Sequence, residues 1–119
     1  MSMKKIYYLA TCQTCQKIIA ETKPGKDFVL QNIKEEKITP AQLDEMKKLA
    51  GSYDALFTKR SMKFRAWNLQ DKELTENDKR DLILKEYTFL KRPVFVIGQN
   101  IFIGNAKATV ESTKKAIKS

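Results

Sequence analysis

The only two cysteines of the chain, Cys12 and Cys15, lie two residues apart directly after an apolar run, Ile6 to Ala10. That run predicts a buried strand. When a strand ends in a Cys-x-x-Cys turn that opens a helix, the first sulfur lies at the helix N-terminus. Unpaired backbone N–H groups and the helix dipole favour a thiolate over a thiol at that place. This opening segment therefore predicts thiol redox chemistry.

The composition indicates a small globular protein. A chain of 119 residues with 42% hydrophobic and 31% charged residues can form one domain with a modest core. The N-terminal apolar stretch is too short for a signal peptide, and no apolar run approaches membrane-spanning length. We therefore expect a cytoplasmic protein with no membrane partner. In a reducing compartment, two closely spaced cysteines are typically catalytic, redox-sensing or metal-binding, because so small a disulfide loop removes little entropy from the unfolded chain.

The absence of histidine narrows the possible chemistry of the two cysteines. A tetrahedral zinc site needs four ligands, so two would have to be carboxylates or come from a second subunit, and we expect no metal site. A Cys-His nucleophilic pair is excluded for the same reason. Any thiolate must therefore be stabilised by helix geometry and by lysine or arginine.

The formal net charge of +9, from 23 basic and 14 acidic residues, would attract an acidic partner. Nucleic acid, an acidic protein and a small oxyanion are all candidates on charge alone. The basic residues are nevertheless scattered along the chain, with no long cationic tail and no ladder of aromatic residues among arginines. We interpret most of them as solvated surface and do not expect direct binding to nucleic acid.

Strands and helices alternate along the sequence. The hydrophobic pattern predicts strands at 4–10, 27–33, 94–97 and 101–103. The predicted helices lie at 14–22, 40–50 and 53–57, from 76 to just before Arg92, and from Gly104 onward. Thr39 and Gln42 are spaced for a capping box around Pro40. The strand-helix-strand start implies parallel pairing with a right-handed crossover.

This order, β-α-β followed by a helical insertion and then β-β-α, predicts an α/β protein with a thioredoxin-like (glutaredoxin-like) fold and a mixed four-stranded sheet. We expect a single domain over 1–119, with the helical insertion at about 39–91. In that plan the proline before the third core strand is commonly cis and lies across from the Cys-x-x-Cys turn, and Pro93 occupies this position. An ordinary trans proline at the start of a strand is the alternative.

Three segments at matching positions make the resemblance to a known family specific: Tyr8 to Lys17 with both cysteines, Thr58-Lys59-Arg60-Ser61, and Leu90 to Val96 followed by Ile103-Gly104. Over nearly its whole length the chain resembles the arsenate reductase and Spx family, thioredoxin-like proteins with a helical insertion. The resemblance implies an oxidoreductase.

The resemblance also implies roles for individual residues. Cys12 matches the nucleophile that, in the reductases, attacks arsenate and is released through glutathione and glutaredoxin. Arg92 matches an arginine that binds the oxyanion and holds the cysteine as thiolate, and Arg60 matches a mid-chain arginine approximately. A thiolate beside guanidinium groups can hold an anion against a nucleophile. Lys17 is a second source of positive charge, and Pro93 would help to shape the substrate site.

The chain departs from the glutaredoxin-linked reductases at three positions. Those proteins have no cysteine where this chain has Cys15, and they have arginines where it has Gln16 and Asn105. A second thiol allows Cys15 to resolve Cys12 within the protein. We therefore expect a thiol-disulfide oxidoreductase acting on a disulfide or an oxyanion such as arsenate. We expect no bound cofactor, and we expect glutathione with glutaredoxin, or thioredoxin, as the reductant and redox partner.

Two alternatives remain open at this point. The Cys-x-x-Cys motif is closer to Spx, so the chain is alternatively a redox-sensing regulator that binds the RNA polymerase α subunit. The pair could also consist of two unreactive thiols in a binding domain. An enzyme requires Cys12 to be the more acidic and exposed thiol, with Cys15, one turn into the helix, partly buried and less reactive.

Overall fold

The computed structural model describes residues 4–118, which fall into two compact units. The first unit combines the two ends of the chain, up to Glu36 and from Arg92 onward, and the second spans Lys37–Lys91. The elements of the first unit are β1 (Lys4–Tyr8), α1 (Gln13–Thr22), β2 (Val29–Asn32), β3 (Val94–Ile97), β4 (Asn100–Ile103) and α5 (Lys107–Lys118). The expectation of one domain over the whole chain stays a prediction.

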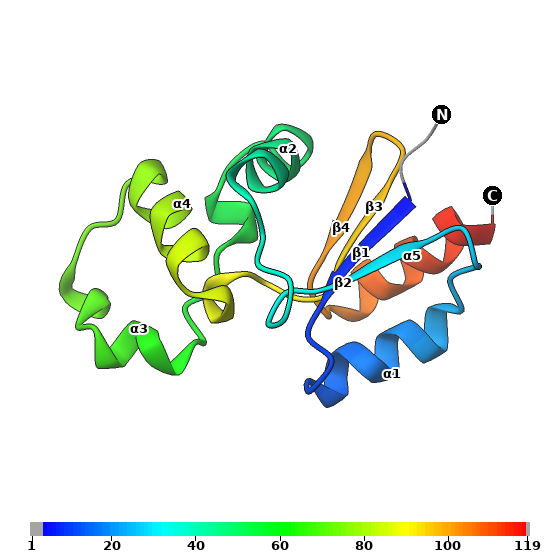
Figure 1. Cartoon of the computed structure of the whole chain (residues 1–119), viewed down its shortest axis with the longest axis horizontal. Helices are drawn as coiled ribbons and strands as arrows, with labels where there is room; N and C mark the ends of the chain where they lie inside the picture. Colours follow the sequence, from blue (N-terminus) through cyan, green and yellow to red (C-terminus); the bar gives the residue numbers. More distant parts are fainter. Residues whose placement is uncertain (1–3, 119) are drawn as a thin grey trace. The chain divides into compact units, whose positions relative to one another are not determined.

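The first unit contains a four-stranded sheet in the order β2-β1-β3-β4 (Figure 1). β1 pairs with β2 in parallel and with β3 in antiparallel fashion, and β3 and β4 are antiparallel. Ile6 lies opposite Leu30 on one side and Phe95 on the other. The sheet is therefore mixed, and the predicted thioredoxin-like α/β architecture is confirmed.

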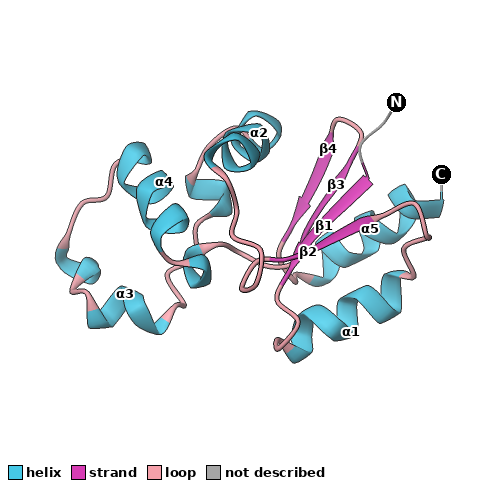
Figure 2. Ribbon diagram, viewed as in Figure 1, coloured by secondary structure: helices cyan, strands magenta, loops and turns pink. Residues whose placement is uncertain are grey.

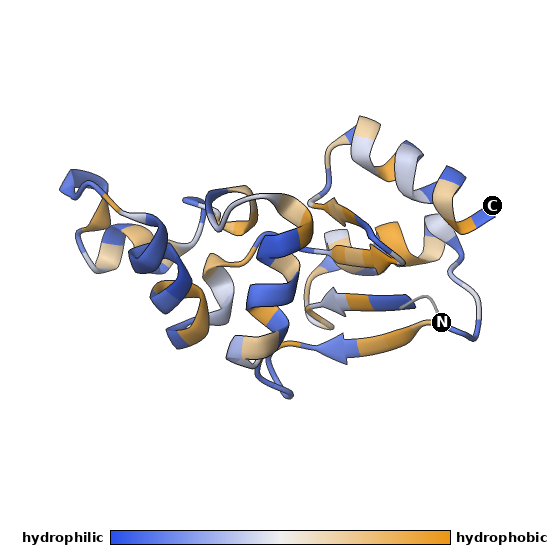
Figure 3. Ribbon diagram, turned by 90° about the horizontal axis from the view of Figure 1, so that it is seen from above, coloured by the Kyte–Doolittle hydropathy of each residue, from blue (hydrophilic) through white to orange (hydrophobic). Residues whose placement is uncertain are grey.

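Helices α1 and α5 contact each other and cover the same face of the sheet (Figure 1). The buried core beneath them draws on both helices and on the strands, with the Phe28 and Phe95 rings edge to face at 6.5 Å. Its fully or nearly fully buried members are Ile6, Ile18, Phe28, Phe95 and Val110. Along α5 hydrophobic and hydrophilic residues alternate (Figure 3), as a helix with one buried side requires. No helix within residues 4–118 is long and apolar enough to cross a membrane.

The second unit is built from short helices joined by loops (Figure 2). Its α-helices are α2 (Pro40–Ala50), α3 (Met62–Ala66) and α4 (Glu76–Lys85), and its 3₁₀ helices are η1 (Asp54–Leu56), η2 (Leu69–Asp71) and η3 (Tyr87–Phe89). The rings of Phe57 and Phe89 stack at 5.3 Å in its interior. A single β-bridge joins Phe57 to Leu90.

Two threonines begin the longer helices of this unit. Thr39 caps α2 by accepting the Gln42 N–H at 3.1 Å, and the Gln42 side chain accepts the Thr39 N–H in return. Thr75 and Asp78 form the same reciprocal pair at the start of α4. Each pair satisfies backbone donors that a helix start otherwise leaves open. The capping box predicted at Thr39 is thus confirmed.

A polar cluster joins α2, η1 and α4. The Asp44 carboxylate accepts hydrogen bonds from the Arg80 Nε at 2.8 Å and from the Tyr53 hydroxyl at 2.6 Å. The Arg80 guanidinium, helped by Tyr53, lowers the pKa of Asp44 to about 2. Glu76 accepts the backbone N–H groups of Tyr53 and Asp54 at 2.8 and 3.2 Å. These bonds fix the η1 segment against both neighbouring helices.

The predicted helix that ran from residue 76 to just before Arg92 is wrong in its second half. α4 ends at Lys85, Glu86 is extended with φ −140° and ψ 113°, and η3 follows. The Glu86 side chain accepts the Thr88 N–H at 3.3 Å and so begins a new turn. The apolar spacing of Phe89 and Leu90 continues the helical pattern, but a local cap ends the helix before them.

Several other boundaries differ from the predicted ones. β1 stops at Tyr8 because the next residues form a turn, and β2 starts only at Val29 because the Phe28 N–H bonds to the Gly25 carbonyl at 3.2 Å. β4 starts at Asn100, one residue before the predicted strand at 101–103. No helix was predicted in the stretch that forms α3 and η2. Each of these helices is too short to show a helical repeat of hydrophobic residues.

We predict that Thr39→Ala and Thr75→Ala each lower the free energy of unfolding by about 1 kcal/mol, because each removes an N-cap acceptor. Urea denaturation followed by circular dichroism measures this. The matched control is Ser112→Ala in the middle of α5, where the exposed hydroxyl caps nothing, and it should change stability by less than about 0.5 kcal/mol. Equal losses in all three variants would contradict the capping role.

Candidate active site

The turn between β1 and α1 is held by three hydrogen bonds. The Cys12 N–H donates to the Leu9 carbonyl at 3.0 Å. The Ala10 N–H donates to the Asn32 side-chain oxygen at 3.3 Å, and the Gln16 side-chain amide donates to the Ala10 carbonyl. The turn is therefore fixed from the end of β2 on one side and from the first turn of α1 on the other.

Cys12 is the N-cap residue of α1. Its backbone is extended, with φ −88° and ψ 114°, and its carbonyl accepts the Gln16 N–H at 3.1 Å. The first backbone N–H groups of a helix have no partner within the helix. At this helix the N–H groups of Thr14 and Cys15 stabilise negative charge on the Cys12 sulfur. The predicted place of the first sulfur at a helix N-terminus is thus observed.

The pKa of Cys12 lies below that of an ordinary thiol. Partial burial by itself would raise the pKa, but hydrogen bonds from the Cys15 backbone N–H, the Cys15 thiol and the Thr14 N–H together outweigh it. The positive charge of Arg92 lowers the pKa further. Because Cys12 is also partly exposed, it is an acidic thiol that a substrate in solution can reach.

Cys15 has the opposite character. Its side chain is fully buried, and burial raises its pKa to about 11. The charge of Cys12 and the hydrogen bond to it raise the pKa as well, whereas a backbone hydrogen bond with Leu9 and the charge of Arg92 lower it. Both cysteines are free thiols in the structure. Cys15 is therefore a protonated donor to the Cys12 thiolate.

Arg92 and Pro93 belong to the same unit as the two cysteines. The Arg92–Pro93 peptide bond is cis, the isomer that the thioredoxin-like plan predicts. Pro93 is buried, and its carbonyl accepts the Gly104 N–H at 2.9 Å, which fixes the start of β3 against the end of β4. The charge of Arg92 acts on both sulfurs, so the structure brings this predicted residue to the cysteine pair.

The other two predicted site residues, Lys17 and Arg60, are exposed on the surface of their own units. Lys17 is exposed on α1. Arg60 is exposed in the second unit, where its backbone N–H donates to the Thr58 hydroxyl at 3.2 Å. Asn105 is exposed in the short segment before α5. The substrate-binding roles of Lys17 and Arg60 stay predictions.

Sequence reasoning missed the structural role of two residues at the turn. Gln16 was noted only as a departure from the reductases, yet it bonds the Ala10 carbonyl. Asn32, which accepts the Ala10 N–H, was not singled out at all. Asn32 ends a strand that is parallel to β1, and the carboxyl ends of parallel strands meet at one edge of a sheet. The predicted parallel pairing of the first two strands was the sequence signal that could have placed Asn32 beside the turn.

Comparison with solved structures finds the same fold over nearly the whole chain. An arsenate reductase from Vibrio cholerae has a TM-score of 0.76 at 15% identity, covering 97% of this chain and 98% of that one. An arsenate reductase related protein from Brucella melitensis has a TM-score of 0.70 at 22% identity, covering 92% of each chain. A Staphylococcus aureus protein has a TM-score of 0.71 at 24% identity, covering 92% and 97%. These likenesses show the fold.

Among curated proteins no sequence matches the chain. The model of the ArsC family, in contrast, matches residues 7–113, a span that includes both cysteines, Arg92 and Pro93. This match supports the expected oxidoreductase class. By its sequence and its fold, the chain belongs to the ArsC family of thiol-dependent reductases.

Proposed function

We propose that the chain is a dithiol oxidoreductase in which Cys12 attacks the substrate and Cys15 resolves the resulting intermediate. The observation that supports this most is the contrast between the two thiols. Cys12 is partly exposed with a lowered pKa, and Cys15 next to it is fully buried with a pKa of about 11. Cys12 is thus the more acidic and more accessible of the two thiols, whereas Cys15 is buried and stays protonated beside it.

In the first step the Cys12 thiolate attacks one sulfur of a substrate disulfide. A new S–S bond forms between Cys12 and that sulfur, the old S–S bond breaks, and the second substrate sulfur leaves as a thiolate that takes a proton from water. Attack by a thiolate through a mixed disulfide is the general route of thiol-disulfide exchange. The N–H groups of Thr14 and Cys15 supply the polar environment from which the thiolate reacts.

The first step itself prepares the second. In the mixed disulfide Cys12 has no negative charge, so two of the factors that raise the pKa of Cys15 are removed: the charge of Cys12 and the hydrogen bond to it. Arg92 still favours the Cys15 thiolate. Cys15 then loses its proton to solvent and attacks the Cys12 sulfur. The products are the Cys12–Cys15 disulfide and the reduced substrate, and two electrons have passed to the substrate.

Arsenate is a second substrate that the same steps accommodate. Attack of Cys12 on arsenic would displace water and give a sulfur-arsenic(V) bond. Attack of Cys15 on the Cys12 sulfur would break that bond, leave its electron pair on arsenic and release arsenite. Arg92 is the residue at the site that would bind the anion, and Arg60 would be a further one. Gln16 bonds the turn instead of offering a guanidinium, so we place disulfides first among substrates.

The oxidised pair has to be reduced again by an external thiol. We propose glutathione with glutaredoxin, or thioredoxin, as this reductant, acting in the cytoplasm. Binding to the RNA polymerase α subunit remains the alternative function, and it rests on the Cys-x-x-Cys motif alone. An active site without turnover in any thiol-reducing system would favour that alternative over the enzyme.

We predict that Cys12 reacts with iodoacetamide at half its maximal rate at a pH below the ~8.5 of a free thiol, because its pKa is lowered. Cys15→Ala and Arg92→Met should each raise this midpoint, because each removes an interaction that stabilises the thiolate. Mass spectrometry of the Cys12 peptide across pH measures the rates. Lys17→Met is the charge-matched control and should change the midpoint less than Arg92→Met. A wild-type midpoint at or above the free-thiol value would remove the basis for the nucleophile.

We also predict different fates of the mixed disulfide in two cysteine variants. With oxidised glutathione, Cys15→Ser should accumulate glutathione on Cys12, because no second thiol is present to displace it. Wild type should release glutathione and form the Cys12–Cys15 disulfide, and Cys12→Ser should stay unmodified. Intact-protein mass spectrometry distinguishes the three. If wild type retained the glutathione adduct as long as Cys15→Ser, Cys15 would not be the resolving thiol.

A further inference from the structure

Helix α3 is anchored to the second unit by one side. The Phe64 ring lies edge to face with Phe57 at 6.3 Å, and Trp67, just past the helix end, lies 5.5 Å from the Phe89 ring. At the other end, the Ser61 hydroxyl shares a 2.6 Å hydrogen bond with the Thr88 hydroxyl. The short helix is therefore fixed at its start, its middle and its end.

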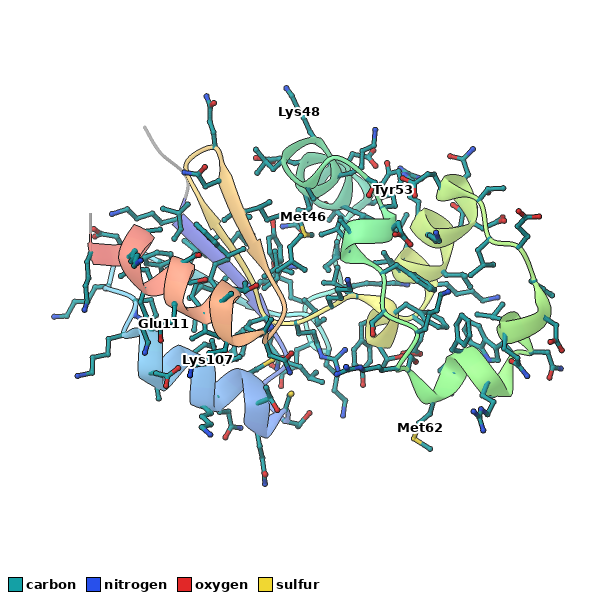
Figure 4. The ribbon with its side chains drawn as sticks, turned by 180° about the vertical axis from the view of Figure 1, so that it is seen from behind. Met46, Lys48, Tyr53, Met62, Lys107 and Glu111 are labelled. Carbon is teal, nitrogen blue, oxygen red and sulfur yellow. The ribbon has the colours of Figure 1, made fainter. Side chains whose placement is uncertain are left out.

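The side opposite Phe64 is exposed. Each helical residue turns by about 100° around the axis, so Met62 lies nearly opposite Phe64, with Lys63 and Arg65 on its two flanks. Met62 is 89% exposed, and Figure 4 shows its side chain extending outward from the helix. Lys63 and Arg65 are exposed too. We call these three residues the α3 face.

The α3 face has an uncompensated positive charge. From residue 55 to residue 70 the chain has four basic residues and no acidic one: Lys59, Arg60, Lys63 and Arg65. Elsewhere in the unit Lys79 and Arg80 are paired with aspartates at 2.8 Å. Within the part of the chain that the structure describes, neither Lys63 nor Arg65 takes part in an ion pair. Their charges face solvent.

We infer that the α3 face docks an acidic protein segment, a helix with carboxylates on either side of an apolar side chain. The apolar residue would pack on Met62, whose unbranched side chain adapts to different shapes. The carboxylates would pair with Lys63 and Arg65. Because α3 is already anchored, docking orders little of the protein.

The aromatic residues in and next to α3 favour a protein over a nucleic acid as the partner of the α3 face. Binding of single-stranded nucleic acid typically uses exposed aromatic rings on which bases stack. Here the rings of Phe64 and Trp67 are half-buried against Phe57 and Phe89. Lys85 also lies over the Trp67 ring, with its Nζ 5.2 Å from the centroid. The exposed side of α3 offers an apolar side chain and cations instead.

The test measures binding of a fluorescent helical peptide to the full chain by anisotropy. The peptide is about 18 residues long, so that it is helical in water, with glutamates on either side of a central leucine. Lys63→Glu with Arg65→Glu should weaken binding by at least about tenfold, and Met62→Ser by about fivefold. The charge-matched control is Lys48→Glu with Lys107→Glu, two exposed lysines on α2 and α5 (Figure 4), and it should weaken binding less than about threefold.

The same assay contains the outcomes that would overturn the inference. Peptides with glutamine for each glutamate, or alanine for the leucine, should bind more weakly than the parent peptide. Equal loss of binding in the α3 double variant and the control variant would mean that binding depends on the net charge of the protein and not on the α3 face. No binding of the parent peptide, or tighter binding of a DNA duplex that the α3 double variant abolishes, would likewise overturn it. Thermal melts establish that each variant folds.

Discussion

The Cys15 thiol donates a hydrogen bond to the Cys12 sulfur, and the properties of both thiols depend on this pair. The bond lowers the pKa of Cys12 and raises that of Cys15, so it makes one sulfur reactive by keeping the other protonated. Burial is the largest cause of the raised pKa of Cys15, because a fully buried thiolate would be poorly solvated. Once Cys12 is bonded to a substrate, its negative charge and the hydrogen bond to it no longer raise the pKa of Cys15. The order of the two steps is therefore fixed by electrostatics.

A small number of residues in the fold hold Cys12 and Cys15 in position. Parallel pairing of β1 and β2 brings Asn32 next to the turn, where it accepts the Ala10 N–H, and Gln16 bonds the carbonyl of the same residue. The core beneath α1 and α5 holds α1 in place, and Cys12 is the N-cap residue of that helix. The segment directly before β3 contributes Arg92, the cation that acts on both sulfurs. Each of these contacts lies within the unit that contains the cysteines.

The parts of this site that follow local rules could be predicted from sequence. A strand followed by Cys-x-x-Cys and a helix places Cys12 at a helix N-terminus, and the spacing of Pro93 before a β-branched strand places it at β3. The bond between Asn32 and Ala10 was not predictable in this way, because it depends on which strand ends meet. The end of α4 was missed for another reason. The apolar spacing beyond Lys85 fits a helix, and only the local bond of Glu86 to the Thr88 N–H interrupts it.

The central claim is that bonding of Cys12 to a substrate activates Cys15. The most direct measurement places a methylthio group on Cys12 with methyl methanethiosulfonate and follows release of methanethiol as a function of pH. Release requires the Cys15 thiolate, so the midpoint of its pH profile is the pKa of Cys15 when Cys12 is uncharged. The expected midpoint lies below the value of about 11 that holds beside the Cys12 thiolate, although burial still raises it. A midpoint at 11 or above would contradict the claim.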